Sequence, residues 1–170
     1  MKGLRDEIYW WSLELIENGL KLQGIFLLLS TWNFAYFRFH LVDFDLERFE
    51  RVLRKCDFEY FKGKKFETLN LFDLKVVQKI KDIYSKLSKV EGISYVGATK
   101  VMHLLNPRAF MMWDTCIRKF YRAKTTPDGY LEFMREMQAR YRTRKFKNLK
   151  SGVTVPRAID LYNMKKCRQK

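Results

Sequence analysis

Asp114 is a carboxylate in an apolar, aromatic stretch of a strongly basic chain. It lies between Trp113 and Thr115, directly after a run of phenylalanine and methionine. A carboxylate held at low dielectric stabilises a positive charge that develops beside it, and it can orient or deprotonate an attacking nucleophile. An aspartate just before an apolar helical run is also a favoured helix N-cap. The local pattern therefore leaves a catalytic and a structural interpretation of Asp114 open.

A second feature with chemical potential is a glycine-bracketed turn upstream. The segment from Gly92 to Gly97 follows one helical pattern and precedes another, which we expect to run from Ala98 to Leu105. Backbone N–H groups at such a joint point outward at a helix N-terminus, and this arrangement suits a phosphate oxygen. The residues expected to contact phosphate here are Val96, Gly97, Ala98, Thr99 and Lys100.

The elements that must position these residues are helical. Apolar residues recur at intervals of three and four along most of the chain, and no alternating strand pattern competes with them. We therefore predict an all-α fold of about seven to nine short helices in one bundle. The patterns are clearest over residues 8–16, 46–56, 71–87, 130–141 and 158–167. The uncharged run from Leu22 to Phe37 is too short and too polar to span a membrane, and we expect a buried core helix there.

The charge distribution divides the chain into two parts. The net charge is +15, with 34 Lys and Arg against 19 Asp and Glu, and the stretch from Arg135 to Lys170 holds 12 basic and 2 acidic residues. Such a segment is the electrostatic footprint of a nucleic-acid partner, although a solvated tail is the alternative. We expect a helical domain over residues 1–142, with a hairpin at about 85–105. A basic segment over 143–170 would end in a helix and pack on or flank that domain. The expected phosphate contacts outside the hairpin are Arg118, Lys119, Arg142, Arg144, Lys145 and Lys147.

The cysteines and the first residues bear on the compartment. Cys56, Cys116 and Cys167 are widely spaced and odd in number, which excludes a paired-CxxC zinc site and indicates a fold without disulfides in a reducing compartment. We expect no metal and no cofactor. The first residues carry acids before any apolar run and do not resemble a secretory signal. We therefore expect an intracellular, monomeric protein, in the cytoplasm, nucleoid or nucleus, with no membrane partner.

Together, the hairpin and the aspartate segment resemble the helix-hairpin-helix (HhH-GPD) DNA glycosylases. In that family, a leucine-proline-glycine-valine-glycine hairpin precedes a helix, and a later valine-aspartate-threonine-histidine-valine-x-arginine segment supplies the catalytic aspartate. The similar segments here are Ile93-Ser94-Tyr95-Val96-Gly97 and Trp113-Asp114-Thr115-Cys116-Ile117-Arg118. Residues 26–33 and 77–84 are similar to two further helices of the family, so the resemblance covers about residues 22–125 in the right order.

The sequence departs from the family at two points in the hairpin region. Ser94 and Tyr95 replace the proline and the first glycine of the hairpin. Bifunctional members carry a nucleophilic lysine two positions after the second glycine, where this chain has Thr99. Lys100 follows one step later, about 100° further round a helix. If Ala98 is treated as an insertion, Lys100 takes the place of the nucleophile, and both registers remain open.

The resemblance implies a base-excision repair glycosylase that acts on double-stranded DNA. The enzyme would flip a damaged or mismatched base and cleave its N-glycosidic bond. Asp114 would stabilise the positive charge that the sugar gains, and Lys100 would add AP-lyase activity as a Schiff-base nucleophile. Trp32 would wedge into or stack on the DNA, and Asn33 would bond the orphaned base. The alternatives are a non-catalytic helix-hairpin-helix module that only binds DNA or RNA, and a helical adaptor whose basic tail binds an acidic protein.

Overall fold

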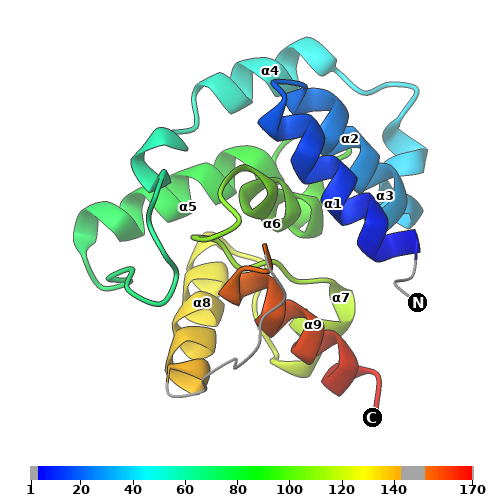
Figure 1. Ribbon diagram of the computed structural model, residues 1–170. Coiled ribbons are helices and arrows are strands. Elements are labelled where there is room, and N and C mark those ends of the chain that lie inside the picture. Colours follow the sequence, from blue (N-terminus) through cyan, green and yellow to red (C-terminus); the bar gives the residue numbers. More distant parts are fainter. Residues whose placement is uncertain (1–3, 143–151, 170) are drawn as a thin grey trace.

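The computed structural model describes residues 4–142 and 152–169, and this part of the chain is built from helices (Figure 1). It contains nine α-helices, a single 3-10 helix and no strand, which confirms the predicted all-α fold. The helices are α1 (Leu4–Glu17), α2 (Lys21–Trp32), α3 (Phe34–His40), α4 (Leu46–Arg54), η1 (Glu59–Phe61), α5 (Leu74–Ser88), α6 (Ser94–Leu105), α7 (Thr115–Phe120), α8 (Pro127–Tyr141) and α9 (Val155–Cys167).

Local capping signals set several of the helix starts. At five N-termini, the side chain of the residue before the helix accepts a hydrogen bond from a backbone N–H in the first turn, and α8 and α9 also have proline there. Such caps satisfy N–H groups that have no partner within the helix. The caps are Asp45, Asp73, Asp114, Thr126 and Thr154.

Helix α6 is the central element of the fold. Every residue from Val96 to Leu104 is buried, and the helix contacts α1, α2 and α5. A helix that is covered on all sides shows little amphipathic periodicity, because apolar residues are needed around its whole circumference. Polar groups on α6, among them Thr99, Lys100 and His103, are therefore held inside the protein rather than at its surface.

The turn before α6 differs from the sequence-based expectation. The helix begins at Ser94, four residues earlier than predicted, and the turn is made by Gly92 with a φ of 83° and by Ser94 with a φ of 61°. Gly97 lies inside the helix, where an added Cβ would come within 3.2 Å of Ile93 and 3.3 Å of the Asn33 amide. Its role is therefore close packing between segments and not a bend in the chain.

The uncharged run from Leu22 to Phe37 forms two helices instead of the expected one. Asn33 breaks the run with non-helical dihedral angles (φ −122°, ψ 21°), and its side-chain amide donates a hydrogen bond to the Ile93 carbonyl at 3.3 Å. The side-chain bond ties the α2–α3 joint to the turn before α6. As a result, Trp32 ends α2 and Phe34 begins α3, with the Phe34 ring largely in solvent.

Helix α9 packs against α7, and a disulfide joins the two helices. The bond connects Cys116, in the first turn of α7, to Cys167, the last residue of α9, while the thiol of Cys56 is free and buried. The expectation of a fold without disulfides was therefore wrong, because a pairing across 51 residues leaves no local signal in the sequence. Among the described helices, none is both long and apolar enough to traverse a bilayer.

Candidate functional site

A cavity of about 530 Å³ lies where α9 faces the ends of α1, α2 and α7 and the middle of α6. A volume of this order is typical of sites that enclose a small molecule or a single extruded group. The lining combines aromatic and aliphatic walls with eight charged side chains. The lining residues are Arg5, Asp6, Trp32, Lys100, Met112, Trp113, Asp114, Arg157, Asp160, Leu161, Met164, Lys165, Arg168 and Gln169.

Asp114 lines this cavity and also caps α7. Its Oδ1 accepts a hydrogen bond from the backbone N–H of Ile117 at 2.8 Å, while the residue itself is only half-buried. No ion pair formed by the described residues includes Asp114, and none of them bonds its Oδ2. The structural and the catalytic interpretations are therefore compatible, because the cap uses one carboxylate oxygen and leaves the other for the cavity.

Lys100 reaches the same cavity from the interior of α6. The residue is 3% exposed, and its ammonium group donates a hydrogen bond to the backbone carbonyl of Trp32 at the end of α2. Burial lowers the pKa of Lys100 to about 8, against the opposing effect of the nearby carboxylates of Asp114 and Asp160. At pH 7 about a tenth of a lysine with this pKa is free amine, far more than for a solvated lysine, and the free amine is the form that a nucleophilic lysine requires.

Thr99, which holds the position of the family's lysine in the ungapped register, does not reach the cavity. The residue is fully buried, and its hydroxyl donates to the Val96 carbonyl at 3.0 Å and accepts from the Trp113 backbone N–H at 3.3 Å. The geometry thus places Lys100, and not Thr99, beside Asp114. Because its polar atoms are used inside the protein, the expectation that Thr99 contacts phosphate was wrong.

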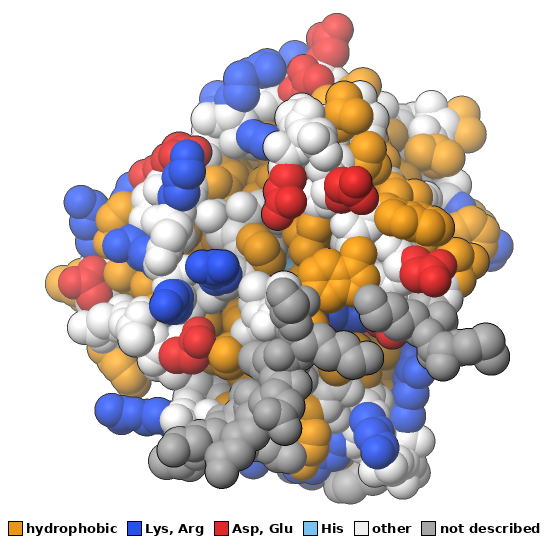
Figure 2. All heavy atoms as spheres, viewed as in Figure 1, with side chains coloured by type: hydrophobic (Ala, Val, Ile, Leu, Met, Phe, Trp, Pro, Cys, Tyr) orange, Lys and Arg blue, Asp and Glu red, His pale blue; other side chains and the backbone are white. Residues whose placement is uncertain are grey.

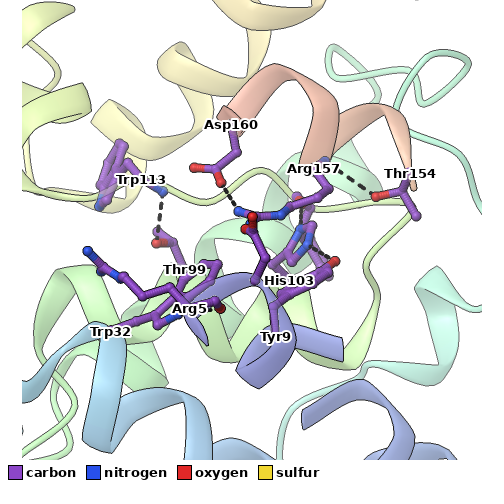
Figure 3. Close-up of polar contacts among 11 residues, drawn as sticks. Arg5, Tyr9, Trp32, Thr99, His103, Trp113, Thr154, Arg157 and Asp160 are labelled. Atoms are coloured by element: carbon purple, nitrogen blue, oxygen red, sulfur yellow. Dashed lines mark hydrogen bonds and ion pairs between the residues drawn. The ribbon is translucent and has the colours of Figure 1, made fainter. Parts of the chain in front are cut away.

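Two charged residues of α9 complete the cavity wall. Arg157 and Asp160 are both buried and form an ion pair, and Arg157 also donates to an Asp6 oxygen at 2.9 Å. The guanidinium group lies over the rings of Tyr9 and Trp32, at 4.6 and 4.7 Å from their centroids (Figure 3). Burial raises the pKa of Asp160 to about 6 despite its pairing with Arg157. Asp160 is therefore a cavity carboxylate whose charge can change at mildly acidic pH.

Sequence reasoning missed this pair, although a signal was present. Asp160 is the only acid after Glu136, in the most basic part of the chain. A single carboxylate in such a basic segment has many cations nearby in the sequence with which it can pair, and a carboxylate that is buried requires such pairing. The second member, Arg157, was hidden among twelve basic residues of that segment, since nothing in the sequence distinguishes a buried arginine from a solvated one.

His103, three residues after Lys100, is part of the structural core. Its Nδ1–H donates to the Phe110 carbonyl at 2.7 Å, so its Nε2 is free to accept the hydrogen bond from the Tyr9 hydroxyl at 2.8 Å. Burial lowers the pKa of His103 to about 4, which keeps the ring neutral. This histidine therefore holds Tyr9 beneath Arg157 and does not face the cavity.

The other predicted contacts are distributed over the molecule. The structure brings Trp32, Lys100 and Asp114 together at the cavity, but Asn33 and the Val96–Ala98 segment are buried in the packing around α6. Residues 96–98 lie in the first turns of α6 and are buried, so their backbone contact with phosphate stays a prediction. Arg118 donates to the Ala123 carbonyl at 3.0 Å, whereas Lys119 and Arg142 are exposed. Arg144, Lys145 and Lys147 lie outside the described residues.

The basic rim of the cavity comes from residues that the sequence did not single out. Arg5 on α1 and Lys165 and Arg168 at the end of α9 line the opening together with Gln169. Within the part of the chain that the structure describes, no three His, Cys, Asp or Glu side chains are grouped as a metal site would require.

Comparisons with known proteins give no match: no family model, no curated protein and no solved structure is similar to this chain. The geometry of the cavity and the physical chemistry of its residues are therefore the grounds for a functional assignment.

Proposed function

We propose that the protein is a DNA glycosylase of the HhH-GPD type. It flips a damaged or mismatched base into the cavity beneath α9 and cleaves its N-glycosidic bond. The observation that carries the proposal is the convergence of Asp114 and the buried, low-pKa Lys100 on one cavity whose rim is basic. The packing of α5 against α6 across the short glycine turn at residues 89–93 agrees with a helix-hairpin-helix.

The cavity residues are suited to each step of base removal. The free amine of Lys100 attacks C1′ of the nucleotide, and the C1′–N bond breaks as the base leaves with its electron pair and takes up a proton. The sugar carries positive charge in this transition state, and the Asp114 carboxylate stabilises it. The resulting amino sugar opens to a Schiff base, which borohydride reduces to a stable protein–DNA adduct.

The charges around the cavity favour an anionic ligand. Five cations line it against three carboxylates, and Arg5, Lys165 and Arg168 are the cations of its rim. Contacts between such side chains and DNA phosphates release counterions, so the affinity should fall steeply as salt is added. The aromatic ring of Trp32 lies at the same wall, where a flipped base can stack.

The experiment that tests the proposal is base release from a set of duplexes, each carrying one lesion. The set includes uracil, a thymine mismatch, 8-oxoguanine, an alkylated purine and an abasic site, and each reaction is also trapped with borohydride. We expect release from at least one duplex, loss of that release in Asp114→Asn, and loss of the trapped adduct in Lys100→Gln. Release that survives Asp114→Asn would refute the role of this carboxylate.

A second candidate function rests on the cap itself. Because Asp114 bonds the Ile117 N–H at 2.8 Å, it has a structural duty that a non-catalytic DNA-binding module would also need. Tight binding of every duplex in the set without release of any base would favour this module over the enzyme.

A further inference from the structure

Helix α3 and the residues that follow it expose an unusual number of large apolar side chains. Only Phe37 of this helix is buried, while Phe34 is 53% exposed and Phe39 is 70% exposed. Tyr36, Leu41 and Val42 extend the exposed surface. Figure 2 shows hydrophobic side chains gathered on the right of the molecule, over the region where α3 lies in Figure 1. Exposed patches of this kind mark interaction sites.

A cation lies within this aromatic surface. The Arg38 guanidinium is 5.2 Å from the centroid of Phe34 and 4.5 Å from that of Phe39, so the three side chains form a stack along the helix. Arg38 is in no ion pair of the described residues, and α3 itself contains no acid. The nearest acids in the sequence are Asp43 and Asp45, beyond the helix, and Asp45 is the cap of α4.

The aromatic surface begins at the wall of the cavity. Trp32 lines the cavity, and Phe34 follows two residues later, within about 7 Å along the chain. Phe34 and Phe39 are five residues apart, which is about 7.5 Å along a helix axis. Helix α3 therefore lies within reach of a strand whose nucleotide enters the cavity.

The charge of the protein decides between a second copy of the chain and a polyanion as the occupant. Each chain carries a net charge of +15, so two copies that met at Arg38 would bring like charges together. A nucleic-acid strand has the opposite charge, and its bases stack on aromatic rings and on arginine irrespective of sequence.

We propose that α3 is a stacking platform for unpaired bases, in which Phe34 and Phe39 hold bases of the strand that leaves the cavity and Arg38 neutralises its phosphates. The preferred substrate is thus DNA in which the nucleotides next to the target base are unpaired. This inference deepens the proposed function, on which the role of the cavity rests, but the platform itself is tested by binding alone.

Three labelled DNAs of equal length test the platform: a single strand of about 15 nucleotides, the matching duplex, and a duplex with a central unpaired bubble. Their affinities are compared by fluorescence anisotropy at one fixed salt concentration for the wild type, Phe34→Ala, Phe39→Ala and Phe39→Trp. We expect each alanine variant to lose roughly tenfold in affinity for the single strand and the bubble, because a base–aromatic stack is removed. The affinity for the paired duplex should change little, and Phe39→Trp should retain binding.

Phe72 provides a matched control. It is 72% exposed and lies 4.5 Å from the Arg135 guanidinium, beside the start of α5 and away from α3. Phe72→Ala removes the same kind of exposed ring–arginine stack and should leave all three affinities unchanged.

Two binding results would overturn the platform. An equal loss for all three DNAs, or no loss in either alanine variant, would show that α3 does not hold unpaired bases. Sedimentation that finds a wild-type dimer, dissociated by Phe39→Ala, would instead assign the surface to self-association. Base release is measured separately. Selective binding of the single strand without release of any base would support the platform and count against the glycosylase. Base release together with unchanged affinities of the alanine variants would support the glycosylase and count against the platform.

Discussion

Replacing Lys100 with methionine should make the protein more stable while it destroys covalent catalysis. Burial lowers the pKa of Lys100 from 10.5 to about 8, so at neutral pH the folded protein holds an ammonium group in surroundings that disfavour it. At about 1.4 kcal/mol per pKa unit, the charge costs about 3 kcal/mol of folding free energy. Methionine removes this cost but also loses the hydrogen bond to the Trp32 carbonyl, worth about 1 kcal/mol. The net expected gain at pH 7 is therefore about 2 kcal/mol.

The pH dependence of this gain identifies its cause. Below pH 8, the lysine is protonated in both the folded and the unfolded chain, and the full cost applies. As the pH rises from 8 to 10.5, the folded protein loses its proton before the unfolded chain does, so the cost of the charge disappears and the gain from methionine shrinks.

Urea unfolding of the wild type and Lys100→Met at pH 7 and pH 10 measures both quantities. The exposed Lys119 serves as the control, since Lys119→Met should leave the free energy of unfolding nearly unchanged at either pH. A Lys100→Met variant that is less stable than the wild type at pH 7, or a gain that is the same at both pH values, would refute the reasoning. If Lys100→Met is more stable than the wild type and no longer forms the borohydride-trapped adduct, then Lys100 serves the reaction at the expense of the stability of the fold.

Three further predictions concern the same cavity. Borohydride trapping through Lys100 should speed up about tenfold between pH 7 and 9 and then level off, since the free-amine fraction of a group with a pKa of about 8 saturates there; a rate that continues to climb above pH 9 would contradict the lowered pKa. Asp114→Asn should slow base release at least about a hundredfold, yet leave the melting temperature nearly unchanged because asparagine caps helices equally well; a large loss of thermal stability would reveal a mainly structural aspartate. Between pH 4 and 7, the wild type should lose up to about 3 kcal/mol of stability in urea that Asp160→Asn retains, because burial raises the pKa of Asp160 to about 6 and its charge is unfavourable in the folded protein; Asp6→Asn is the control, and stability profiles of the two variants that change equally with pH would argue against this titration.

The fold class and the approximate positions of most helices followed from the sequence because they depend on local patterns. Helical apolar spacing acts within a few residues and located the helices, although the caps Asp73 and Thr126 place the starts of α5 and α8 three residues from the predicted ones. The break at Asn33 and the early start of α6 were missed. Both depend on packing between α2 and the turn before α6, which the local sequence does not contain.

The candidate site could be predicted only in part for the same reason. Asp114, Lys100 and Trp32 were chosen from sequence, and they line one cavity. Arg157 and Asp160 entered the site only through the folding of α9 against α1 and α7, which pairs residues about 150 positions apart, such as Asp6 and Arg157. Long-range pairings of this kind follow from tertiary structure and have no periodic signature in the chain.

Because Cys116 and Cys167 form a disulfide, the stability of this protein depends on whether thiol reductants are present. It closes a loop across 51 residues, and a crosslink of that span removes enough freedom from the denatured ensemble to contribute roughly 4 kcal/mol. The crosslink anchors the far end of α9, the helix that supplies Arg157 and Asp160, to the helix that Asp114 caps. A reductant in the buffer would therefore loosen the attachment of α9 to α7 at the cavity, although neither cysteine lines the cavity.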